Sequence, residues 1–200
     1  MNANKEHFAE IIESSLHGWT AQSWQWDNFP IFGSIVSVEA AHRTLFGLVY
    51  QVHTGSTDPI HSPFPYKKTE EELLRDHPQI FEFLKTTFNC LIIGYEEKEK
   101  IYYLLAPEPS KIHAFVKHVE VPKIRRFFSS AHYLHLIFSL SNQVSNMDEL
   151  LLAILYQLEQ LKILDEAKLT DFIDFYSLSI GNDYRRLKIF LKRIEYHIKS

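Results

Sequence analysis

The fold is decided by residues 31–53, which read IFGSIVSVEAAHRTLFGLVYQVH. Apolar and polar side chains alternate through residues 31–39, and the alternation resumes at residues 45–53 after a short turn. A period of two predicts two antiparallel β-strands. Gly33 and Gly47 lie at matching places in these strands, where the missing side chain permits the strong coiling that a small closed barrel requires.

Three segments further along the chain extend the β pattern. Residues 89–95 and 101–105 predict a hairpin across the charged turn at residues 96–100, and residues 113–118 predict a fifth strand. The sequence therefore predicts a small antiparallel β-barrel, closed or partly open, over residues 31–121.

A helical insertion is predicted within the barrel, at residues 67–88. The proline-rich residues 55–66 lead into it, and Thr69 with Glu72 forms a capping box that starts a first short helix. Pro78 restarts the helix, since proline is tolerated in a first turn but not in a helix interior. The insertion thus consists of two short helical pieces between the second and third strands.

Residues 1–30 predict a helix followed by an aromatic arm. Apolar side chains recur at helical spacing through residues 6–16, which predicts a short amphipathic helix. Trp19, Trp24 and Trp26 follow, outside any clearly periodic element. Large aromatic side chains in such a place either pack the arm against the barrel or serve at an interface.

The last part of the chain, residues 122–200, changes to a helical period. A strong helix is predicted at residues 145–164, and two more at residues 169–179 and 184–198, with a break at residues 181–182. Short connections favour antiparallel packing of these helices. The predicted fold class is therefore α+β: a β-barrel with a helical insertion, followed by a C-terminal helical region.

Four segments of the barrel region resemble the HAS barrel, the small β-barrel found beside the motors of HerA-type DNA translocases and rotary ATP synthases. They are residues 32–38, 47–49, 90–94 and 107–116, and residues 121–128 resemble the helix that leads such chains away from the barrel. The order is similar: two glycine-containing strands, an apolar strand ending in glycine, and a proline-rich turn before the last strand. The resemblance implies a stand-alone member of the family without an ATPase domain.

The sequence lacks the motif that nucleotide hydrolysis by such a motor requires. A Gly-x-x-x-x-Gly-Lys-Ser/Thr loop cradles phosphates with its backbone N–H groups, and neither residues 55–57 nor residues 67–69 supply that pattern. The carboxylates at residues 70–72 and 96–99 fall in a first helical turn and a hairpin turn, where they are solvated. We therefore predict a protein that is not an enzyme and that needs no cofactor.

Eleven histidines raise a minor alternative, a metal-dependent hydrolase. His132 and His135 are spaced to share one helical face, but a zinc site needs two further ligands. Cys90, the only cysteine, has apolar neighbours typical of a buried thiol. The favoured prediction is therefore that the protein has no metal site.

The net charge of −4 is distributed unevenly. Residues 183–200 carry six Lys or Arg against two acids, whereas residues 1–182 carry fifteen against twenty-three. The basic end suggests an alternative function, a DNA-transaction accessory that contacts phosphates. A solvated outer face explains the same charges, so nucleic acid is not the partner that we favour. The residues of this alternative are Arg185, Arg186, Lys188, Lys192 and Arg193.

The favoured prediction is a protein-interaction or assembly module for a larger complex. The resemblance suggests a ring-forming ATPase as the partner, and homo-oligomers are compatible with the same surfaces. No apolar run approaches the roughly 18 residues of a membrane span, and a lone cysteine fits a reducing compartment, so we expect a cytoplasmic protein. The candidate contact residues are stiff aromatics and prolines: Trp19, Trp24, Trp26, Pro63, Phe64, Pro65 and Tyr66.

Overall fold

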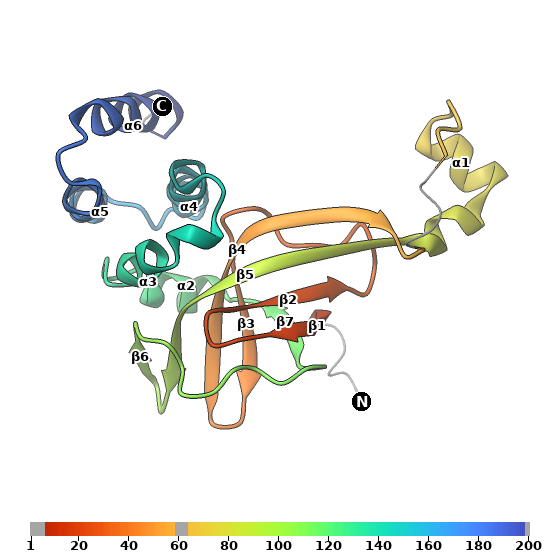
Figure 1. Ribbon diagram of the computed structural model, residues 1–200, viewed down its shortest axis with the longest axis horizontal. Helices are drawn as coiled ribbons and strands as arrows, with labels where there is room; N and C mark the ends of the chain where they lie inside the picture. The colour runs from red at the N-terminus through yellow and green to blue at the C-terminus, as the bar shows by residue number, and fades with distance from the viewer. Residues whose placement is uncertain (1–6, 59–63, 199–200) are drawn as a thin grey trace.

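A closed antiparallel β-barrel forms the centre of the protein, with helices on one side and a long two-stranded arm on the other (Figure 1). The structure is a computed structural model, and it describes residues 7–58 and 64–198. The predicted α+β class is confirmed, and the barrel is closed rather than partly open.

The described residues contain seven strands, which belong to one antiparallel sheet. They are β1 (His7–Ser14), β2 (Gly18–Ser23), β3 (Ile35–Ala40), β4 (Arg43–Ser56), β5 (Leu84–Glu97), β6 (Lys100–Tyr102) and β7 (Phe115–His118). Their order is β2-β1-β7-β3-β4-β5-β6, and the pairing of β2 with β5 closes six of them into a ring. β6 pairs with the end of β5 that extends past β2 and lies outside the ring.

The predicted N-terminal helix is wrong, because residues 7–14 form strand β1 of the barrel. The pairing of β1 with β2 shifts register between Ile11 and Glu13, as in a β-bulge. A bulge interrupts strict alternation, so Phe8, Ile11 and Ile12 fall at a spacing that imitates a helix. Among the described residues the barrel therefore begins at His7, and residues 7–23 belong to its first two strands instead of a separate arm.

The described residues also contain six α-helices and two 3-10 helices. They are α1 (Glu70–Asp76), η2 (Pro78–Phe83), α2 (Val121–Phe127), α3 (Tyr133–Ser139), η3 (Ser141–Gln143), α4 (Met147–Gln160), α5 (Glu166–Ile180) and α6 (Tyr184–His197). The three predicted C-terminal helices are confirmed as α4, α5 and α6, although α4 is capped by Asn146 and ends before the predicted residue 164. Within the part of the chain described, no helix is both long and apolar enough to cross a membrane.

Strands β4 and β5 extend beyond the barrel as the arm, which carries α1 and η2 at its end (Figure 1). Their ladder continues to the pair Ser56 and Leu84. The capping box of Thr69 and Glu72 is confirmed. The predicted end of the insertion at residue 88 is wrong, because β5 begins at Leu84 and Phe88 is buried in the barrel interior.

The predicted hairpin at residues 31–53 is confirmed as β3 and β4, with a later start. Residues 31–34 form a turn instead, in which Gly33 has a φ of 79°. A Cβ on Gly33 would lie 2.5 Å from the Cβ of Ala153 in α4. Gly33 therefore allows a close approach of α4 and does not coil a strand.

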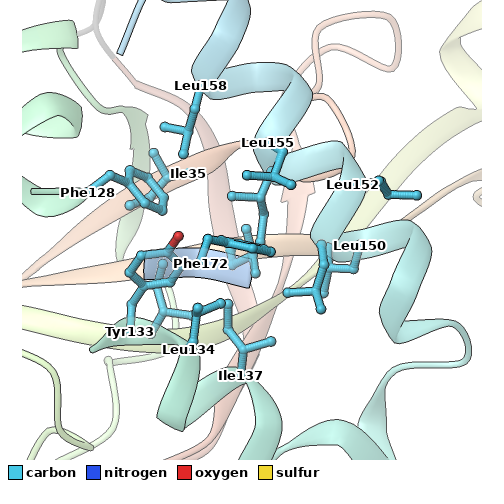
Figure 2. Packing of buried hydrophobic residues seen from close by; sticks show 14 of the residues in the cluster. Ile35, Phe128, Tyr133, Leu134, Ile137, Leu150, Leu152, Leu155, Leu158 and Phe172 are labelled. Carbon is cyan, nitrogen blue, oxygen red and sulfur yellow. The ribbon is translucent and has the colours of Figure 1, made fainter. Parts of the chain in front are cut away.

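Two apolar clusters hold the molecule together. One fills the barrel interior, and the other lies between the outer faces of β3, β4 and β5 and the C-terminal helices. Figure 2 shows Ile35 of β3 beside Phe128 and Leu158 in the second cluster. Because strands and helices share this cluster, the predicted boundary near residue 121 does not separate two independent cores.

Candidate functional site

Trp19 is a core residue rather than a contact residue. Its side chain is only 3% exposed and belongs to the cluster inside the barrel. The indole ring lies against Gly47 of β4, where a Cβ would come within 2.3 Å of the ring. The glycine that the sequence predicts for strand coiling therefore makes room for Trp19.

Trp24 and Trp26 lie at the surface but have different partners. Trp24 is exposed and meets Phe115 edge-to-face at 5.3 Å between ring centroids. Trp26 is half-buried and stacks on Phe81 of η2 at 5.7 Å. Its carbonyl accepts a hydrogen bond from Thr86 Oγ1 in β5. Trp26 thus positions the end of the arm. Of the three tryptophans, only Trp24 is exposed enough to contact another molecule with its ring.

The aromatic loop of the prediction lies at the end of the arm. Pro63 is outside the described residues. Phe64, Pro65 and Tyr66 are exposed, Phe64 to 72%, and the Phe64 ring meets the Tyr66 ring edge-to-face. Tyr66 also contacts His77 beyond α1. We call residues 64–83 the arm tip.

The arm tip and the adjoining ends of β4 and β5 line an open, mostly apolar groove of about 680 Å³. Neither α1 nor η2 has a single buried residue, although both carry large apolar side chains. Phe83 and Leu74 are more than half exposed. An exposed apolar surface of this kind, set among charged residues, is typical of a contact site. The groove is lined by Ser56, Asp58, Phe64, Pro65, Tyr66, Lys67, Lys68, Leu73, Ile80, Phe81, Phe83 and Leu84.

Local interactions add to the stacking of Phe81 on Trp26 in holding the arm tip in shape. The Thr57 backbone N–H donates to the Phe83 carbonyl at 2.7 Å, which joins the two ends of the insertion. Lys68 Nζ lies 2.9 Å from Asp76 Oδ2 across α1. Hydrogen bonds from Arg75 and Lys68 lower the pKa of Asp76 to about 2. These contacts link the two ends of the insertion and the two ends of α1.

Two of the five predicted phosphate contacts, Arg186 and Arg193, are half-buried and paired with carboxylates of α4. Arg186 Nη2 lies 2.6 Å from Asp148 Oδ1 of α4, and the Tyr176 hydroxyl donates to the same oxygen. Burial and the nearby Asp148 raise the pKa of Tyr176 to about 12. Arg193 pairs with Glu149 at 2.6 Å. These pairs attach α6 to α4, so Arg186 and Arg193 are structural.

The other three basic residues form an exposed row on α6, which we call the basic strip. Arg185, Lys188 and Lys192 follow one another at spacings of three and four residues, so they lie on one face of the helix. No ion pair involves them within the described part of the chain. Tyr184 and Tyr196 are exposed at the two ends of the same helix.

The histidines and the cysteine are not assembled into a centre. His132 Nδ1 is hydrogen-bonded to Ser130 Oγ, and His135 lies against the Phe175 ring. Among the residues described, no group of three or more His, Cys, Asp or Glu side chains is arranged to hold a metal ion. Cys90 is buried, and burial raises the pKa of its thiol, which disfavours the thiolate.

The groove residues on α1 and η2 are the functional candidates that sequence reasoning misses. Ile80 and Phe81 read as the apolar face of a helix that packs on its own protein. Instead, the arm carries that face away from the core. One feature of the sequence could have indicated these residues. The apolar face lies within an insertion between two paired strands, and the predicted insertion contains only two short helical pieces, which are too small to bury it.

The fold and the groove define an α+β protein with a closed six-stranded barrel and a projecting arm. No family model matches this sequence, and no curated protein is similar to it at a significant level. What the arm tip does must therefore follow from its own geometry.

Proposed function

We propose that the protein is a non-catalytic interaction module that assembles or stabilises a larger complex, and that the arm tip contacts the partner. The observation that carries the proposal is the absence of any buried residue in α1 and η2, in spite of their apolar side chains. Covering apolar surface is favourable by about 25 cal/mol per Å². Burial of the groove residues by a partner therefore contributes favourably to the free energy of binding.

The composition of the arm tip supports a protein partner. Aromatic side chains such as Phe64 and Tyr66 are enriched in protein interfaces, while exposed charges such as Glu70 and Lys67 are typical of an interface rim. Because the arm projects from the barrel, its tip is accessible to another protein (Figure 1).

The kind of complex is suggested by the resemblance to HAS barrels. We propose a member of that family without its ATPase domain and a ring-forming ATPase as the partner. A cytoplasmic setting is part of the proposal, and the single, buried Cys90 supports it. All three statements rest on analogy of fold and composition.

Photo-crosslinking from the arm tip tests the proposal. A photoreactive phenylalanine analogue replaces Phe64 or Phe83. The control carries it at Leu104, whose exposure lies between those of the two tip positions but which lies outside the tip. We expect both tip positions, and not position 104, to give adducts with the same multisubunit protein in cells. Equal adducts from all three positions, or none from the tip, would contradict the proposed contact.

A further inference from the structure

The arm tip and the basic strip lie at opposite ends of the molecule. Figure 1 shows α1 at one end of the longest axis and α6 at the other, with the barrel between them. An arm built on a continuous β ladder cannot fold back over that distance. Contact between these two surfaces therefore requires two copies of the chain.

The charges of the two surfaces are complementary. The arm tip contains five acidic residues against three basic ones, and Lys68 and Arg75 are already paired with Asp76. Glu70 and Glu71 at the start of α1 are exposed, with no ion-pair partner in the described regions. The basic strip offers three cations that have no ion-pair partner among the residues described.

Each surface combines its charge with exposed apolar side chains. At the arm tip these are Phe64, Leu74 and Phe83. At the other end, Leu178 of α5 is 82% exposed, and Tyr184 stands at the start of α6. Contact between these apolar side chains removes their surface from water, which stabilises the complex. The flanking charges then determine how the two copies are oriented.

We propose that the arm tip of one copy docks on the basic strip of a second copy. The inference rests on the proposed function, since it uses the same arm tip as a contact surface, but it places a second copy of the chain there in place of a ring-forming ATPase. Because the two surfaces are different, the contact is heterologous: it closes into a ring or continues as an open chain. The protein would thus form a scaffold of its own.

The contact should be weak and sensitive to salt. Exposed charges interact across water, and the screening length falls to about 3 Å at 1 M salt from about 10 Å at 0.1 M. Self-association should therefore appear at high protein concentration and low salt. It should decrease as salt is added.

Sedimentation velocity on the purified full chain provides the test. One variant reverses the tip charges (Glu70→Lys with Glu71→Lys), and Glu72 is kept because it belongs to the capping box. The second reverses the strip (Arg185→Glu, Lys188→Glu and Lys192→Glu). The third carries both sets. A control, Glu99→Lys with Glu108→Lys, changes the charge as much as the tip variant does, at exposed sites elsewhere.

We expect the wild type and the control to sediment faster as their concentration rises, and each single-surface variant to remain monomeric. The variant with both reversals should assemble again, because complementarity is restored with opposite signs. Circular dichroism checks that every variant is folded. A monomeric wild type at all concentrations, or failure of the double reversal to restore assembly, overturns the proposal.

Two further outcomes separate this inference from its rivals. If the wild type is monomeric and the strip variant loses binding to a duplex oligonucleotide, the strip serves nucleic acid, and the docking of a second copy is wrong. If the wild type is monomeric but Phe64 still crosslinks to another protein, the proposed function holds and only this inference fails.

Discussion

At the residue scale, the contact between Trp19 and Gly47 shows how one small residue determines what a large one can do. The indole ring occupies the space that a side chain on β4 would fill. Both residues can be selected from the sequence, Trp19 as an aromatic of undecided role and Gly47 as a strand glycine. The contact between them cannot be predicted from the sequence, because 27 residues separate them along the chain. Only the register of the paired strands brings them together.

Gly47→Ala is predicted to destabilise the protein by about 1–3 kcal/mol, because it overpacks the barrel interior against Trp19. Urea denaturation measures the free energy of unfolding. Gly55→Ala in the same strand is the control, since its nearest neighbour is the end of the His53 side chain. The cost of Gly47→Ala should shrink when Trp19 is first changed to Leu. An equal cost in both backgrounds would show that the ring is not the obstacle.

At the element scale, regular periodicity is what the sequence reveals best. Helices α4 and α6 are predicted because their apolar residues keep a helical period. Strands β3 and β4 are predicted because apolar, β-branched and aromatic residues dominate both segments on either side of a short turn. Strand β1 is missed because of the register shift near Ile11, and β2 because its inward residues include the small Ala21 and Ser23. Both strands depend on barrel closure, a long-range event that local pattern does not contain.

Asp148→Ala is predicted to cost about 1–3 kcal/mol, because the buried Tyr176 hydroxyl and the Arg186 guanidinium lose their acceptor. Glu149→Ala, the matched control, removes the more exposed pair with Arg193 and should cost no more than about 1 kcal/mol. Urea denaturation of both variants gives the comparison. Equal costs would mean that the Asp148 cluster does not attach α6 to α4.

The arm tip is predicted to be dispensable for folding. Ser56 and Leu84 are direct partners, so an Asn-Gly turn in place of residues 57–83 closes the hairpin. The deletion removes the stacking of Phe81 on Trp26, worth about 0.5–1.5 kcal/mol. Thermal denaturation should therefore remain cooperative, with a melting temperature lower by only a few degrees. Loss of cooperative unfolding would show that the tip supports the core.

At the scale of the whole molecule, the arrangement has a stable centre and two dissimilar ends. The sequence predicts that the aromatic loop near Phe64 and the basic helix are candidate contact sites. It does not predict that they lie at opposite ends of the molecule, because the direction of the arm is set by the β4–β5 ladder. The sequence also does not show which basic residues of α6 are available to a partner. Arg186 and Arg193 form their ion pairs with carboxylates of α4 only in the folded chain.

The central claim, that the arm tip is the contact surface, is tested most directly by comparing proteins captured from native cells by the full chain and by the variant lacking residues 57–83. Quantitative mass spectrometry should find a multisubunit partner with the full chain and lose it with the trimmed variant. Capture of the same proteins in the same amounts by both would contradict the claim.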